Sequence, residues 1–147
     1  MFKHILIPTD GSPTSAKAVE GGIELARQLG ARVTGFHACE PALARVYGDG
    51  YMIGPRDAAG SAEHANEAGE RAVAQIAAAA QAAGVPFERL MVEADSAYRG
   101  IIDAATSRGC DAIFMASHGR SNIAELVLGS VTHQVLSHSK IPVLVYR

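Results

Sequence analysis

The 147-residue sequence contains only two cysteines, Cys39 and Cys110. Two cysteines are too few for a disulfide framework, and their separation fits no metal-binding motif. We therefore interpret both as small hydrophobic side chains of the interior rather than as ligands or redox groups.

Net charge and long apolar runs are also scarce. The formal net charge is −2 and the charged residues, 19% of the total, form no basic run, so nucleic acid is not an expected partner. No apolar stretch reaches the length of a membrane span, and the first residues lack the long apolar region of a signal peptide. We expect a cytoplasmic protein with no membrane partner.

Several motifs of catalysis and nucleotide binding are missing as well. The sequence has no P-loop, and no Gly-x-Gly-x-x-Gly follows its first apolar run. It also has no paired carboxylates, no His-Glu-x-x-His and no nucleophile elbow. The sequence therefore predicts no catalytic residue.

What the sequence does contain is an alternation of apolar runs with helical patterns over a length that suits one domain, residues 1–147. Apolar runs predict strands at 4–8, 32–39, 87–94, 111–116 and 142–146. Helical spacing predicts helices at 13–29, 61–83, 97–108 and 122–138, with a break at Gly129 left open. Residues 41–60 are rich in Gly, Pro and Ala and predict a long loop.

Strands joined by crossover helices form a mostly parallel sheet with helices on both faces, so the predicted fold class is α/β. Ligands of such sheets bind beyond the carboxyl ends of the strands, where the strand order reverses. The strand ends of interest are therefore residues 8–12, 37–40 and 116–119.

The segment from Met115 to Thr132 combines small residues in a way that suits anion binding. Its apolar run ends at Ala116 and leads into a polar turn, and nine residues separate Gly119 from Gly129-Ser130. Glycines and a hydroxyl at strand ends and helix starts let backbone N–H groups approach an anion. This segment therefore predicts a phosphate or nucleotide site.

At these positions the chain resembles the universal stress proteins. The matching segments are Ile-Leu-Ile-Pro-Thr-Asp-Gly-Ser at 5–12, Gly-Phe-His-Ala at 35–38, Ser-His-Gly at 117–119, Gly-Ser-Val-Thr at 129–132 and Lys-Ile-Pro-Val-Leu-Val at 140–145. The resemblance implies a single-domain Rossmann-like fold, similar to the adenine nucleotide alpha hydrolases, with strand order 3-2-1-4-5. It further implies a homodimer through the last strand, Pro142 to Tyr146, and, for one branch, ATP binding with or without Mg²⁺.

That branch carries a signature of Gly, two residues, Gly, nine residues, then Gly followed by Ser or Thr. Gly119, Gly129 and Ser130 match its last three elements, whereas Ala116 stands at the first glycine. A methyl group there crowds a ligand only if the backbone comes very close or needs positive φ. Because three of the four signature elements match, the resemblance is nearer to the ATP-binding branch.

The resemblance assigns site residues along three strand ends. Asp10 would accept a hydrogen bond from a ribose hydroxyl or the adenine amine, although it could equally be a turn residue that caps the first helix. The backbone of Ala38 would pair with the adenine edge, and Gly119, Gly129 and Ser130 would cradle the phosphates. The alternative for these three small residues is purely structural, namely two tight backbone passages and a helix N-cap. The other residues assigned to the nucleotide site are Pro8, Thr9, Met115, Ala116, Ser117, His118, Arg120, Val131 and Thr132.

Three functions stay open at this stage. The leading one is an ATP-binding stress-response module without strong catalysis, because an efficient ATPase needs a group that orients water or stabilises the transition state and the sequence offers none. A dimeric interaction protein that binds no nucleotide is the first alternative, favoured by Ala116. An enzyme, either a slow ATPase or a nucleotidyl transferase, is the second.

Overall fold

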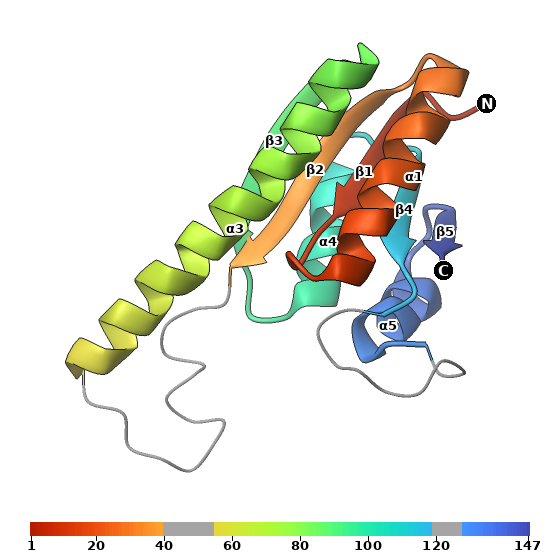
Figure 1. Ribbon diagram of the computed structural model, residues 1–147. Coiled ribbons are helices and arrows are strands. Elements are labelled where there is room, and N and C mark those ends of the chain that lie inside the picture. The colour runs from red at the N-terminus through yellow and green to blue at the C-terminus, as the bar shows by residue number, and fades with distance from the viewer. Residues whose placement is uncertain (40–54, 119–127) are drawn as a thin grey trace.

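The computed structural model describes residues 1–39, 55–118 and 128–147 and shows one parallel sheet between two layers of helices (Figure 1). The strands, in the order β3-β2-β1-β4-β5, all run parallel. They are β1 (His4–Pro8), β2 (Arg32–Cys39), β3 (Phe87–Glu93), β4 (Ala112–Ala116) and β5 (Val143–Tyr146). The helices are α1 (Pro13–Leu29), α3 (Pro55–Ala83), α4 (Ala97–Ser107) and α5 (Ser130–His138). The predicted fold class and strand order are confirmed.

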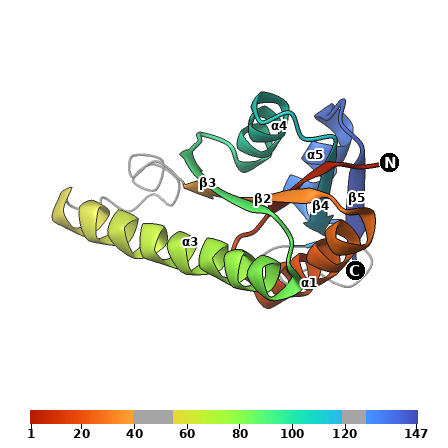
Figure 2. The same ribbon diagram turned by 90° about the horizontal axis from the view of Figure 1, so that it is seen from above.

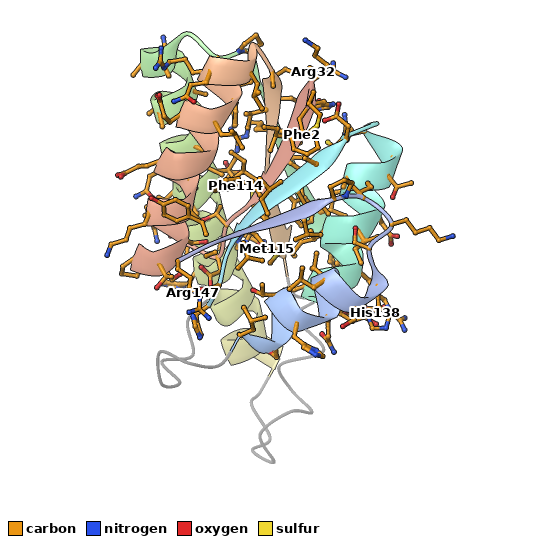
Figure 3. All side chains as sticks on the ribbon, turned by 90° about the vertical axis from the view of Figure 1, so that its right-hand side faces the viewer. Phe2, Arg32, Phe114, Met115, His138 and Arg147 are labelled. Atoms are coloured by element: carbon orange, nitrogen blue, oxygen red, sulfur yellow. The ribbon has the colours of Figure 1, made fainter. Side chains whose placement is uncertain are left out.

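The two faces of the sheet have separate cores, and the view from above shows α1 and α3 on one side and α4 and α5 on the other (Figure 2). Successive residues of a strand point to opposite faces. Ile5 and Ile7 accordingly pack with α1 and α3, whereas Leu6 packs with α4 and α5. Phe114 and Met115, labelled in Figure 3, divide between the two cores in the same way.

Helix α1 begins and ends where the sequence predicts. Ser12 is its N-cap, and the Ser12 side chain accepts a hydrogen bond from Ser15 N–H at 3.2 Å. Gly30 closes the helix in the left-handed region at φ +62°. The helix also lies very close to the sheet, because a β-carbon at Gly22 would stand 2.7 Å from Ile7 Cδ1.

The predicted boundary of the second long helix is wrong. Helix α3 begins at Pro55 rather than at residue 61, so residues 55–60 are helical and not part of a loop. A proline fits the first helical position, because that position needs no backbone N–H donor, and alanines at 58 and 59 favour the helix. The remainder of the predicted loop, residues 41–54, lies outside the described residues.

The remaining boundaries differ by one residue, except at the last helix. Strand β3 ends at Glu93, α4 at Ser107, and β4 and β5 begin at Ala112 and Val143. Leu128 and Gly129 are not helical and α5 begins at Ser130. Residues 122–127 lie outside the described residues, so a helix before Gly129 stays a prediction. Within the described part of the chain, no helix is both long and apolar enough to cross a membrane.

Candidate functional site

The carboxyl ends of β1, β2 and β4 meet at one edge of the sheet because all three strands run parallel (Figure 1). Strand β1 lies between β2 and β4, and the chain leaves β1 toward β2 before it returns to β4 on the other side. The strand order therefore reverses at β1, which is where α/β sheets bind their ligands.

The end of β1 is a tight turn held by its own side chains. Thr9 N–H continues the ladder by donating to Phe36 O at 2.8 Å, and Thr9 Oγ1 accepts from Gly11 N–H at 3.1 Å. Asp10 Oδ1 accepts from Ser12 N–H at 2.9 Å. Asp10 therefore has the turn role considered for it, whereas Ser12 and not Asp10 caps α1. The turn bond is compatible with a ribose contact, because an ionised carboxylate can accept about four hydrogen bonds.

The end of β4 carries the alanine that replaces the signature glycine. Ala116 is a buried strand residue, paired with Tyr146 of β5, and its side chain belongs to the core beneath α1 and α3. No non-glycine residue in the described ranges has a positive φ. The alanine methyl group therefore fills core space and imposes no backbone strain at this position.

The start of α5 is bound directly to this strand end. Gly129 N–H donates to Ser117 O at 2.8 Å, and Thr132 Oγ1 donates to Ala116 O at 2.9 Å. Thr132 is only 3% exposed, so the hydroxyl that the resemblance assigns to the nucleotide binds the backbone of β4 instead. The Gly129 N–H is likewise committed to Ser117.

The first turn of α5 has the features of an anion site. Its N-cap is Gly129, which has no side chain for capping, and its first intrahelical bond runs from His133 N–H to Gly129 O at 2.9 Å. The preceding N–H groups, those of residues 130–132, have no acceptor within the helix. Together with the helix dipole these donors attract an anion, and the exposed Ser130 stands beside them.

A serine and a histidine follow β4 at the same edge. Ser117 N–H donates to Tyr146 O at 2.8 Å, and Ser117 Oγ lies 2.9 Å from His118 Nδ1. The other ring nitrogen, His118 Nε2, is buried and has no hydrogen-bond partner among the residues that the structure describes. The contact between the Ser117 hydroxyl and the His118 ring therefore orders the chain directly after β4.

The end of β2 contributes a histidine to which the sequence analysis assigned no role in the site. His37 is 8% exposed, and its Nδ1 lies 2.9 Å from Thr9 O, so its ring joins β2 to the turn after β1. The adjacent Ala38 is half-buried and packs toward α4. Periodicity could not reveal the histidine bond, since its partner is 28 positions away.

The structure thus brings most of the predicted site residues to one edge. Pro8 ends β1 in register with Phe36, Met115 packs in the core with Val135, and Val131 is half-buried against the same core. Gly119 and Arg120 lie outside the described residues. In the described part of the chain, no group of three or more His, Cys, Asp and Glu could hold a metal ion.

The two thiols have no activated character. Burial raises the pKa of the Cys110 thiol to about 11, and burial together with the Glu93 charge raises the pKa of Cys39. Since the thiolate is the reactive form of cysteine, both thiols are poor nucleophiles at neutral pH. This agrees with their interpretation as small hydrophobic residues, Cys110 buried and Cys39 partly exposed.

Comparison with known proteins connects this geometry to a family. The model of the universal stress protein family matches residues 1–147. The universal stress protein YxiE of Bacillus subtilis is 30% identical over 151 residues, which cover 100% of each chain. The solved structure of hypothetical protein MJ0577, from Methanocaldococcus jannaschii, superposes with a TM-score of 0.84 at 27% identity, covering 99% of this chain and 95% of that one.

A universal stress protein solved in complex with cAMP has the same fold. It superposes with a TM-score of 0.72 at 24% identity and covers 99% of this chain and 97% of its own. The match over the whole chain and the shared fold lead to one conclusion: this chain belongs to the universal stress protein family.

Proposed function

We propose that this chain is an ATP-binding module of the stress response, with its site at the edge formed by β1, β2, β4 and the start of α5. The observation that carries the proposal is the first turn of α5, which is uncapped by any side chain and bound to β4 through Gly129 and Thr132. A helix start fixed in this way presents N–H donors that need no rearrangement to meet a phosphate. The cAMP complex of another family member supports an adenine nucleotide as the ligand class.

Each wall of the site then has a stated role. The N–H groups of residues 130–132 and the Ser130 hydroxyl bind phosphate oxygens, each charge-assisted bond contributing about 1.5–3 kcal/mol. Asp10 accepts from the ribose, and the backbone at Ala38 pairs with the adenine edge. Pro8 and Thr9 form the wall between these two contacts, and Ser117 and His118 follow β4 beside the phosphate side. Gly119 and Arg120, which lie outside the described residues, are expected from the sequence alone to contact the phosphates.

The geometry at Ala116 supports ATP binding over the interaction protein that binds no nucleotide. Its backbone is extended and its side chain packs in the core beneath α1 and α3. The methyl group therefore occupies space that the protein already fills. Magnesium, if it takes part, would be held by the phosphates, since the described residues contain no cluster of metal ligands.

We also propose a homodimer of this domain, residues 1–147, through β5. This strand pairs with β4 on one side only and is the last in the sheet. Its residues Val143, Val145 and Tyr146 are apolar and at least partly exposed, Tyr146 to 39%. An apolar edge strand invites pairing with another chain unless it is covered, and a two-fold copy of β5 covers it.

The test of the site is a variant that fills the phosphate position without unfolding the helix. Gly129 has φ −57° and ψ 150°, which every residue type can adopt, so Gly129→Leu combined with Ser130→Leu leaves the backbone unstrained. We expect this double variant to bind ATP at least about tenfold more weakly in calorimetry. The two leucine side chains would fill the phosphate position, and the Ser130 hydroxyl would be lost.

The matched control places leucines at exposed positions of the same helix, Gln134→Leu with Ser137→Leu, where we expect unchanged affinity. Equal ATP affinity in both double variants would show that the phosphates do not bind at the start of α5. Circular dichroism and thermal unfolding of both variants verify that the fold is intact.

A further inference from the structure

His37 reaches from β2 to the backbone of the turn after β1. Its Nδ1 lies 2.9 Å from Thr9 O, and because a carbonyl can only accept, Nδ1 carries the proton and donates. The ring is 8% exposed, so this bond is shielded from water. The hydrogen bond therefore selects one tautomer and one ring orientation.

Helix α3 leaves a space that matches this ring. A β-carbon at Gly69 would stand 2.4 Å from His37 Cδ2 and 2.7 Å from His37 Nε2, closer than any side chain tolerates. Glycine inside a helix costs about 1 kcal/mol relative to alanine. The imidazole of His37 thus fits into a gap in α3 that exists only because residue 69 has no side chain.

The bond from His37 completes the restraint of Thr9. Thr9 N–H donates to Phe36 O at 2.8 Å, Thr9 Oγ1 accepts from Gly11 N–H at 3.1 Å, and Thr9 O accepts from His37. The carbonyl of Thr9 belongs to the same planar peptide unit as the amide of Asp10. A hydrogen bond that fixes the Thr9 carbonyl therefore also fixes the position of the Asp10 backbone nitrogen.

We infer that His37 is a positioning residue of the nucleotide site: from β2 it holds the Thr9–Asp10 peptide so that the Asp10 carboxylate meets the ribose. This inference rests on the proposed function. A positioning role also explains why a polar ring lies on the face of β2 that packs against α3, where the preceding residues are Val33 and Gly35. Ala38 follows His37 directly in the chain. His37 therefore joins the end of β2, assigned to the adenine, to the end of β1, assigned to the ribose.

Two substitutions separate the hydrogen bond from the packing of the ring. His37→Phe keeps a planar ring in the gap beside Gly69 but cannot donate to Thr9 O. His37→Asn loses the ring but keeps an amide N–H close to the position of Nδ1. The control Val33→Ala lies on the same strand and the same face, is fully buried, and destabilises the core away from Thr9.

The first measurement is ATP affinity by calorimetry. We expect His37→Phe to weaken binding by about three- to tenfold, the loss of one hydrogen bond, and His37→Asn to restore most of it. Val33→Ala should bind ATP like the wild type although it unfolds more easily. The second measurement is the amide NMR spectrum without nucleotide, in which His37→Phe should shift Asp10 and Gly11 and Val33→Ala should not.

The outcomes distinguish this inference from the proposed function. If His37→Phe matches Val33→Ala in affinity and in the Asp10 and Gly11 amide positions, His37 only packs and the inference is overturned. If the wild-type protein binds no ATP, the proposed function fails. The NMR measurement still tests His37 in that case: shifted Asp10 and Gly11 amide resonances in His37→Phe would show that His37 positions the turn, and unshifted resonances would show that it does not.

Discussion

Replacing Thr132 by valine tests whether α5 is fixed to β4 as the structure shows. Valine has the shape of threonine and is also β-branched, so Thr132→Val replaces the hydroxyl by a methyl group and changes little else. In the folded protein that hydroxyl donates to Ala116 O at 2.9 Å, from a side chain that is only 3% exposed. The substitution therefore leaves a carbonyl at the end of β4 without its donor.

The expected loss follows from that contact. A buried acceptor left without its partner costs about 1–3 kcal/mol in the free energy of unfolding. For a domain of this size each kcal/mol lowers the melting temperature by about 2–4 °C. Thr132→Val should therefore melt several degrees below the wild type. It should also bind ATP more weakly, because the start of α5 loses one of its two described bonds to β4.

The matched control is Thr106→Val on α4. Thr106 is exposed, and its hydroxyl donates to Ile102 O at 2.8 Å within the same helix, where water can replace it. We expect this change to stay within about 0.5 kcal/mol of the wild type in urea unfolding. If Thr132→Val is as stable as Thr106→Val, the bond between α5 and β4 does not contribute as argued.

Three further predictions concern packing, pH and assembly. Gly22→Ala should lower the free energy of unfolding by about 1–3 kcal/mol in urea titrations, since its β-carbon would stand 2.7 Å from Ile7 Cδ1. Burial and the Arg32 charge lower the pKa of His4 below 6.5, so the unfolded chain binds this proton more readily. The melting temperature should therefore fall as the pH drops below 6.5, and it should fall less steeply in His4→Gln. Thermal unfolding at a series of pH values measures both. Val145→Lys should convert the proposed dimer to a monomer in sedimentation, and an unchanged sedimentation coefficient would refute pairing through β5.

The sequence predicted those features that local patterns determine. Ser12 followed by Pro13, and Gly30 after the last apolar residue, define α1 because capping and left-handed backbone depend on residue type. The start of α3 was missed because a stretch rich in Gly, Pro and Ala is typical of loops, although a proline followed by alanines also begins a helix.

The site was predicted in outline and not in its bonds. The segments around Asp10, Ala116 and Ser130 are recognisable in the sequence. The parallel sheet brings the ends of β1 and β4 together, and α5 begins beside them at Ser130. The bonds from His37 to Thr9 and from Thr132 to Ala116 join residues 28 and 16 positions apart, and neither leaves a periodic signal. The effect of Ala116 also depended on a backbone angle and a side-chain direction, which only coordinates supply.

ATP binding by this protein can be measured by calorimetric titration of ATP, with and without Mg²⁺, into the wild-type protein and into Ala116→Gly. We expect saturable binding to the wild type and similar affinity in Ala116→Gly, because the alanine methyl group packs in the core and the backbone is extended. No heat from either protein would contradict the ATP site. Binding by Ala116→Gly alone would show that the methyl group blocks the nucleotide.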